Sequence, residues 1–390
     1  MIAATVSSQA KRVFLTDFTR DLRKVGLPAN LRASGRNLTF KCPVEELRQL
    51  SSVILHQARI RRLQESWRFV DSLQRRGIAS QFAAGISLDT EAIRPDLQIC
   101  ETKEDREIFE FCRLTQSVPS AHLLYRQLPF LIRDIAHPQR ALMGILGLSS
   151  SVYSMGARDQ FLGWTVGNGS RRRVGLNSLL QLTVCMAVPP YSFLRAGRLI
   201  ASLVLTDKVA EHFIKRYRTK RNGPNLLGIV TISAKGLHAP IFNRIKLRSG
   251  GLYQRIGCTS GYSSLLFSES TLASAKALVV RCDGSCPDNR AISTLKRALN
   301  LCDIPRESFL KSGSPKGVYL AVPDSAALKA LRSGKVNYLP PYPTVDAAVS
   351  LWKEDMRKAL SKREIVEKVR SFDPASCRAT RERGFFDGTL

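Results

Sequence analysis

The spacing of hydrophobic residues changes character along this 390-residue chain. Residues 9 to 135 show mainly helical periodicity, first from Phe14 to Val25 and again from Ile54 to a helix end at Gly77. From about Gly144, short apolar runs alternate with helical segments. After residue 270 the pattern changes again, to short helices with one strand among them. The sequence therefore predicts three consecutive regions, which are a helical, basic one at 1–140, an α/β core at 141–270 and a small α+β region at 271–390.

The core region alternates strands with helices. An apolar run from Leu180 to Val188 stops at Pro189, a small-residue loop follows at Ala196 and Gly197, and the chain then becomes helix-periodic. We further expect a strand at 225–234, a short helix at 239–247 and a strand at 252–267. This succession favours an α/β (α+β) fold with a mixed sheet that includes a parallel pair.

The C-terminal region contains a rigid segment. Pro340, Pro341 and Pro343 predict a linker before a helix that includes Trp352. The last segment, RATRERGFFDGTL at 378–390, is mostly polar, and we expect it to form a mobile tail.

Charge points to a class of partner. Sixty lysines and arginines against 32 aspartates and glutamates give a formal charge of +28. Such a field concentrates polyanions, and nucleic acid is therefore the expected partner. The alternative is a basic scaffold whose charge is neutralised by acidic partner subunits.

The basic residues gather on a helix between Arg59 and Arg76, in a Gly/Asn/Ser-rich loop that holds Arg171 to Arg173, and around a helix end at 215–221. Phosphate contacts from such clusters would be independent of nucleotide sequence. The residues that we expect to contact DNA or RNA are Arg59, Arg62, Arg171, Arg172, Arg173, Lys215, Arg216, Arg218, Lys220, Arg221 and Arg244.

Cysteine usage and hydropathy indicate a soluble cytoplasmic protein. The nine cysteines are an odd number and are scattered, as in proteins of a reducing compartment. Cys282 and Cys286 have no second pair or nearby histidine to complete a metal site, so we expect no metal there. No segment approaches the roughly 20 uninterrupted apolar residues that a membrane span requires.

Several segments resemble the DruA family in order and spacing. They are ARDQFLGWT (157–165), AVPPYSFLRAGRLIASLV (187–204), IVTISAKGLHAPIFNRIKL (229–247) and YQRIGCTSGYSS (253–264). The family's loop motif usually runs small residue, Gly, Lys and Leu, whereas this chain has Arg198 at the lysine position. An arginine there would contact a phosphate with a planar fork rather than a point charge.

This resemblance implies a role in the bacterial Druantia anti-phage system. It also implies partner subunits, including a large helicase-like protein, and leaves a homo-oligomer open. It does not supply a known reaction.

The layout around residues 195–198 is also similar to the cofactor-binding half of a GNAT acetyltransferase. In such folds, a loop at the start of a helix holds the pyrophosphate of acetyl-CoA. Arg195, Ala196, Gly197 and Arg198 would form that loop here. A lone glycine at this point also suits an ordinary strand-to-helix turn.

A metal-dependent nuclease is the other enzymatic alternative. Its Mg²⁺ would need neighbouring carboxylates, for which Asp159 and Glu211 are candidates, and His238 could serve as a general base. Asp159 could equally pair with Arg158 or cap a helix, and a lone loop histidine is usually a surface residue. The sequence leaves binding subunit, transferase, nuclease and scaffold open.

Aromatic residues beside arginines or glycine-rich loops could stack on the bases of single-stranded nucleic acid. They are Tyr191, Phe193, Tyr217, Tyr253 and Tyr262.

Overall fold

The computed structural model describes residues 2–34, 37–42, 49–116, 119, 125–164, 169–218, 224–234, 236–247, 250–286 and 291–387. The chain forms two compact units, each made of two separate stretches. The first, which we call the helical unit, comprises Met1–Arg62 and Ser260–Pro315. The second, the sheet unit, comprises Leu63–Thr259 and Lys316–Leu390.

The sheet unit is built on a seven-stranded sheet with the order β10-β11-β7-β6-β5-β4-β3. β6 and β7 are parallel, and every other neighbouring pair is antiparallel. The predicted mixed sheet and its parallel pair are thus confirmed. The strands are β3 (Pro95–Ile99), β4 (Gln127–Asp134), β5 (Leu142–Ser150), β6 (Leu179–Ala187), β7 (Gly228–Ile232), β10 (Tyr253–Cys258) and β11 (Gly317–Ala321), beside a small pair β8 (Lys246–Leu247) and β9 (Gly250–Gly251).

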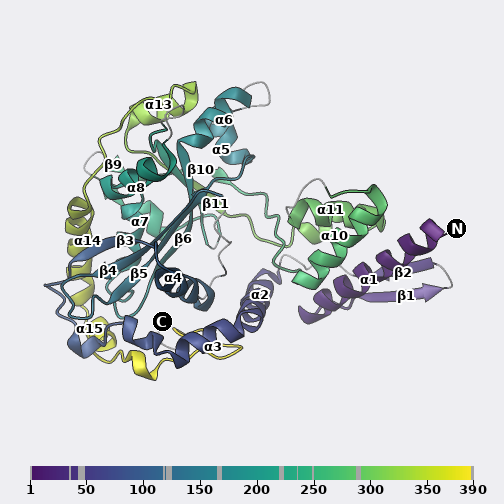
Figure 1. Cartoon of the computed structure of the whole chain (residues 1–390), viewed down its shortest axis with the longest axis horizontal. Coiled ribbons are helices and arrows are strands. Elements are labelled where there is room, and N and C mark those ends of the chain that lie inside the picture. The colour runs from purple at the N-terminus through teal and green to yellow at the C-terminus, as the bar shows by residue number, and fades with distance from the viewer. Residues whose placement is uncertain are drawn as a thin grey trace. The chain divides into compact units, whose positions relative to one another are not determined.

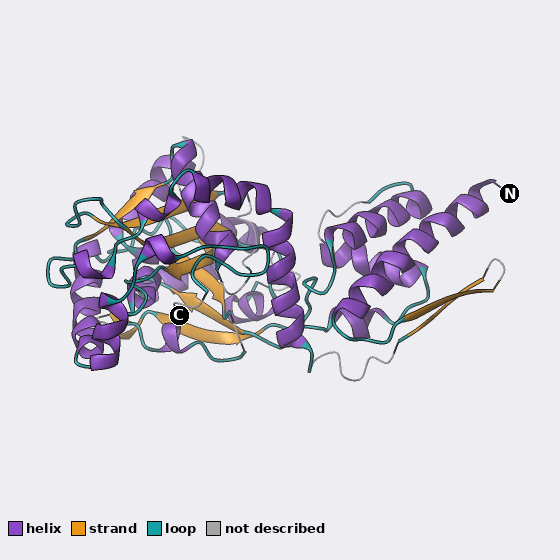
Figure 2. Cartoon of the chain, turned by 90° about the horizontal axis from the view of Figure 1, so that it is seen from below, coloured by secondary structure: helices purple, strands orange, loops and turns teal. Residues whose placement is uncertain are grey.

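Helices cover both faces of this sheet (Figure 2). Along β4, Leu128 and Phe130 join one core cluster and Leu131 joins another, because alternate residues of a strand point to opposite faces. The first face packs against α7, α8 and α14, and the second against α3, α4, α5 and α13. The helices of this unit are α3 (Trp67–Arg75), α4 (Lys103–Thr115), α5 (Gly156–Leu162), α6 (Gly169–Asn177), α7 (Ala196–Ser202), α8 (Asp207–Tyr217), α9 (Pro240–Asn243), α13 (Ser325–Ser333), α14 (Val345–Leu360) and α15 (Arg363–Arg370).

Two units, each made of two separate stretches, replace the three consecutive regions that we expect at 1–140, 141–270 and 271–390. The pairing of β10 with β11 explains this difference. β10 and β11 are antiparallel neighbours, although residues 260–315 separate them in the sequence. The backbone N–H of Thr259 donates to the carbonyl of Lys316 at 2.8 Å, so the chain leaves and re-enters the sheet at one point. Residues 260–315 are therefore an insertion into a β-hairpin.

The expected helical region at 1–140 also contains two strands of the sheet. β3 and β4 form its end, with Leu97 opposite Ile132. Pro129 lies within β4 opposite Gly147, although a proline cannot donate to the strand ladder. β4 is nevertheless almost wholly buried, and this burial of an apolar strand on both faces outweighs the loss of one N–H donor.

The helical unit packs three longer helices and a hairpin around aromatic residues. Its elements are α1 (Ile2–Lys24), β1 (Asn30–Ser34), β2 (Asn37–Lys41), α10 (Glu269–Asp283), α11 (Ala291–Leu301), α12 (Arg306–Leu310) and most of α2 (Ser51–Glu65). Phe18 of α1 lies 5.4 Å from Phe267 and 5.1 Å from Phe309 between ring centroids. Figure 1 shows α1 beside α10, with β1 and β2 following α1.

Buried Asp21 joins α1 to the start of α10. Its Oδ2 atom accepts hydrogen bonds from the backbone N–H of Ser268 at 2.6 Å and from the Thr271 hydroxyl at 2.7 Å. A carboxylate at a helix N-terminus also interacts favourably with the helix dipole. The two separate stretches of the helical unit thus form one core.

Two local predictions require correction. The predicted helix from Ile54 to Gly77 is divided into α2 and α3 at Ser66, although Gly77 has the left-handed conformation expected of a helix end (φ 78°). The C-terminal tail was expected to be mobile, but Phe385 and Phe386 are buried against Phe82, with centroid distances of 5.4 and 5.2 Å. These rings supply the apolar contacts that a free tail would lack.

Within the described residues, every helix is too short or too polar to cross a membrane.

Candidate nucleic-acid interface

Arg126, the residue before β4, contacts two basic helices of the sheet unit. Its guanidinium donates to the carbonyls of Leu176 and Asn177 at the end of α6, each at 2.6 Å. The same group lies over the rings of Phe213 and Tyr217 of α8, 5.6 and 5.7 Å from their centroids. Burial lowers the pKa of Arg126, while Tyr217 acts in the opposite direction. The C-terminal ends of α6 and α8 therefore meet at one end of the sheet.

The strand ends at this point are also joined directly. The backbone N–H of Ser150, the last residue of β5, donates to the carbonyl of Arg126 at 3.0 Å. The hydroxyl of Tyr217 donates to the carbonyl of Gln127 at 2.9 Å. β6 begins beside them, because Ser150 pairs with Leu180. This is the end of the sheet at which the chain leaves β5 and enters β6.

Exposed cations lie on the two helices that meet at this strand end. Arg171 and Arg173 are exposed on α6, and Lys215, Arg216 and Arg218 are exposed at the end of α8. The sequence placed Arg171 to Arg173 in a loop, and that prediction was wrong. Gly175 permits the helix to pack here, because a Cβ at this position would lie 2.2 Å from Cζ2 of Trp164.

Arg172 differs from its two neighbours. Its side chain is mostly covered and donates to the carbonyl of Trp164, and its Nη2 atom lies 3.7 Å from Oδ2 of Asp159. Its guanidinium also lies 5.3 Å from the ring centroid of Tyr153. Arg172 therefore anchors α6, whereas Arg171 and Arg173 point their charge to solvent.

Two exposed tyrosines lie at the same strand end. Tyr125 precedes Arg126 and is 91% exposed, in the left-handed conformation (φ 48°) that bulky residues seldom adopt. Tyr153 follows β5 and is 52% exposed beneath Arg172. Exposed rings beside guanidinium groups are the stacking platforms that single-stranded nucleic acid uses. We call the exposed cations and rings of this end the sheet-end cluster, which comprises Arg171, Arg173, Lys215, Arg216, Arg218, Tyr125 and Tyr153.

Asp159, the best nuclease candidate, has a structural environment. Its Oδ1 atom accepts from Nε and Nη2 of fully buried Arg158 at 2.8 and 2.6 Å, and its Oδ2 atom accepts from the Met155 N–H at 3.0 Å. Arg158 also donates to the carbonyls of Val152 and Tyr153. Burial lowers the pKa of Arg158, and the Asp159 carboxylate opposes this shift. The pair fixes the turn that presents Tyr153.

The other two catalytic candidates lie on different elements from Asp159, which belongs to α5. Glu211 is exposed on α8, and His238 is exposed on the loop before α9. Across the described part of the chain, no three His, Cys, Asp or Glu side chains are grouped as a metal site would require. Of the close cysteine pair, Cys282 is exposed and Cys286 is half-buried.

The loop suggested as a cofactor cradle is covered by α14. Arg198 forms an ion pair with Asp355 at 2.7 Å, and Arg195 lies 3.8 Å from the same carboxylate. Trp352 donates to the carbonyl of Leu194 at 2.9 Å, and Ala196 is fully buried. The two arginines therefore serve to hold α14 against this loop.

The remaining predicted phosphate contacts are dispersed. Arg244 is exposed at the end of α9, while Arg59 and Arg62 are half-buried on α2. Burial lowers the pKa of Arg59. Lys220 and Arg221 lie outside the described residues.

The predicted stacking residues are mostly packing residues. Tyr191 and Tyr253 are buried, and their hydroxyls donate to Asp134 and to the carbonyl of Ala201. Phe193 is half-buried beside Phe372, and Tyr262 belongs to the helical unit. Tyr217 alone among the five adjoins the sheet-end cluster, through Arg126.

Sequence reasoning missed Arg126, Tyr125 and Tyr153. The contacts of Arg126 join residues about fifty or more positions apart, so local spacing carries no trace of them. The adjacency of Tyr125 and Arg126 was the one available signal.

Comparison with known proteins gives a consistent assignment. A family model described as "Druantia protein DruA" matches residues 44–293. A curated "Druantia protein DruA" of Escherichia coli (strain UMEA 4076-1) is 27% identical over 270 residues, which is 65% of this chain and 65% of that protein's own length. No solved structure matches the chain, so the expected likeness to GNAT acetyltransferases is not confirmed.

Proposed function

Because the chain belongs to the DruA family, we propose that it is a nucleic-acid-binding component of a Druantia-type anti-phage system. The observation that carries the binding role is the sheet-end cluster, in which Arg126 brings together the exposed cations of α6 and α8. A formal charge of +28 adds a long-range attraction for polyanions.

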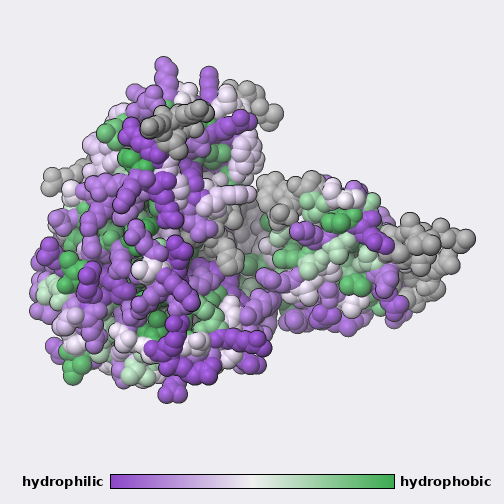
Figure 3. Space-filling view, in the orientation of Figure 1, coloured by the Kyte–Doolittle hydropathy of each residue, from purple (hydrophilic) through white to green (hydrophobic). Residues whose placement is uncertain are grey.

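The cluster favours single-stranded over duplex nucleic acid. Its cations would track a phosphate backbone, and Tyr125 and Tyr153 would receive unpaired bases. Stacking is available only when bases are splayed out of a duplex. On the face of the sheet unit seen in Figure 3, hydrophobic residues are scattered among hydrophilic ones, so that charge and hydrogen bonds dominate what this face offers a partner.

We propose that the chain acts with other subunits of its defence system, including a helicase-like protein that would supply or consume single strands. The alternative is that the cation-rich surface binds acidic partner subunits instead of nucleic acid, so that the protein is a scaffold.

Filter binding of the full chain to single-stranded DNA and RNA across a salt series tests the binding role. Counterion release predicts a linear fall of log affinity with log salt, with a slope of about −0.7 per contacted phosphate. Absence of binding to either strand type at about 50 mM salt would contradict the proposal. Co-purification with acidic subunits that persists after nuclease treatment would then favour the scaffold.

A further inference from the structure

The helical unit carries a second basic surface that the sheet-end cluster does not include. Along α1, the exposed positions from Gln9 to Lys24 recur every three or four residues and form one face. This face holds no free carboxylate, because Asp17 pairs with Arg20 at 2.8 Å and Asp21 is buried at the start of α10. Its members are Gln9, Arg12, Val13, Thr16, Arg20, Arg23 and Lys24.

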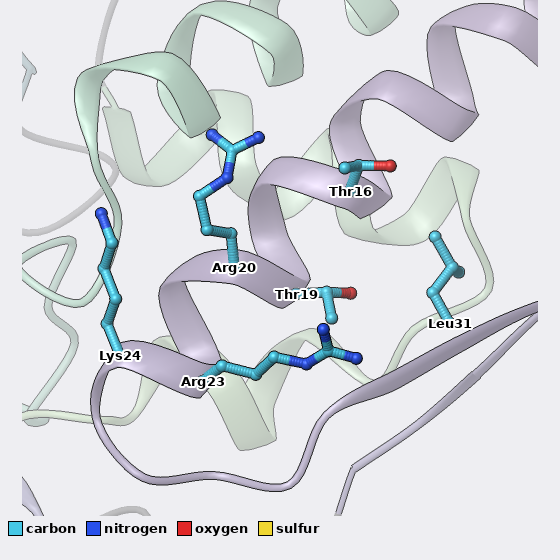
Figure 4. A pocket seen from close by; sticks show the side chains of 6 residues that line it. All are labelled: Thr16, Thr19, Arg20, Arg23, Lys24 and Leu31. Atoms are coloured by element: carbon cyan, nitrogen blue, oxygen red, sulfur yellow. The ribbon is translucent and has the colours of Figure 1, made fainter.

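A pocket of about 580 Å³ opens between this face and strand β1. Its lining combines three cations with two hydroxyls and one apolar residue, which are Arg20, Arg23, Lys24, Thr16, Thr19 and Leu31. Figure 4 shows the hydroxyls of Thr16 and Thr19 and the guanidinium of Arg23 on the side of α1 that faces Leu31.

Thr19 provides an independent sign of a ligand. The residue is 5% exposed, and its Oγ1 atom is buried without a hydrogen-bond partner. An unsatisfied buried hydroxyl destabilises a fold by about 1–3 kcal/mol, so such groups normally have a partner. The Thr16 hydroxyl already donates to the carbonyl of Arg12 at 2.8 Å, which leaves Thr19 as the hydroxyl able to donate to a ligand.

Arg23 is held in position for the same ligand. Its Nε atom donates to the carbonyl of Ala29 at 2.8 Å, and Nη2 lies 3.5 Å from Oδ1 of Asn30. A guanidinium has five N–H donors, so further donors remain for an anion beside Thr19. Phosphate accepts such paired N–H groups well.

We propose that this pocket binds a backbone phosphate of duplex DNA, with the exposed face of α1 lying in the major groove. A helix with its side chains is about 10–12 Å wide and the major groove of B-DNA is about 12 Å wide. Double-stranded RNA has a deep, narrow major groove that excludes a helix, so DNA is the favoured duplex. Arg32, exposed on β1, extends the positive surface onto the hairpin.

The inference rests on the proposed function only in taking nucleic acid as the ligand. Duplex and single-stranded probes test the α1 pocket and the sheet-end cluster separately. The full chain is titrated with a 20-base-pair DNA duplex, an RNA duplex of the same sequence and a single strand, at roughly 100 mM salt. The double variant Arg20→Gln/Lys24→Gln is expected to bind duplex DNA about tenfold more weakly, with single-strand affinity unchanged. Lys358→Gln/Lys368→Gln, which removes two exposed cations from α14 and α15, is the charge-matched control.

Thr19→Val separates binding from folding. Loss of a hydrogen bond to a charged phosphate lowers duplex affinity by about tenfold. The urea midpoint should stay constant or rise, because the variant removes an unpartnered buried hydroxyl.

Three results would overturn the inference. One is a duplex affinity of Arg20→Gln/Lys24→Gln equal to that of the control, another is wild-type duplex affinity in Thr19→Val, and the third is an equal loss for duplex RNA. Failure of the proposed function looks different, because the wild-type chain would then bind no single strand.

Discussion

Replacing Arg171, Arg173, Lys215 and Arg216 together by glutamine is expected to remove most of the affinity for single-stranded nucleic acid. These side chains are exposed on α6 and α8, whose C-terminal ends meet at Arg126. If each cation contacts one phosphate, the slope of log affinity against log salt should become shallower by about 3. Filter binding between about 50 and 200 mM salt measures that slope directly.

The matched control removes four exposed cations elsewhere on the sheet unit. Lys358→Gln, Lys362→Gln, Lys368→Gln and Arg381→Gln change the net charge equally. This control should keep nearly all of the wild-type slope. Equal slopes in the two variants would mean that affinity arises from net charge alone and that the sheet-end cluster is not a site.

Asp159→Asn is expected to have the largest effect on stability. The change leaves the guanidinium of Arg158 buried without its carboxylate, and breaking a buried ion pair in this way costs about 3–5 kcal/mol. The N–H of Met155 also loses a charged acceptor. Urea denaturation followed by circular dichroism should therefore show a strongly lowered midpoint with an unchanged m-value.

Arg173→Gln, an exposed change on neighbouring α6, is the control and should shift stability by less than about 0.5 kcal/mol. The nuclease alternative predicts a different pattern for Asp159→Asn. In a metal site, neighbouring carboxylates repel one another, and replacing one of them removes that repulsion. The variant would then be as stable as the wild-type protein and would lose Mg²⁺-dependent cleavage. Stability equal to that of Arg173→Gln would contradict the structural role of the pair.

The sequence predicted the elements with strong local periodicity. Phe14, Phe18 and Leu22 mark α1 as an amphipathic helix, and the run from Leu180 to Val184 marks β6 as a buried strand. The order β10-β11 could not be predicted in this way, because residues 260–315 intervene between strands that pair directly. Hydrophobic spacing reports which face a residue buries, and not which distant segment covers it.

The candidate site was predictable in its charges and not in its arrangement. Arg171 to Arg173 stand among Gly, Ser and Asn, which favour loops, yet they form α6 because Gly175 lets the helix pack on Trp164. The sequence around Arg195 and Arg198 suggests an anion-binding loop, but in the fold both arginines pair with Asp355 of α14. Each of these outcomes depends on contacts between residues far apart in the sequence, where tertiary packing overrides local propensity.

Photo-crosslinking tests most directly whether the sheet-end cluster is the single-strand site. A single-stranded oligonucleotide that carries a photoreactive base is bound to the full chain, irradiated, and the crosslinked peptides are identified by mass spectrometry. We expect crosslinks at Tyr125, which directly precedes Arg126, and at Tyr153, whose exposed ring lies beside Arg172. Crosslinks confined to other aromatic residues, such as Tyr338 and Tyr342 in the segment before α14, would contradict the assignment.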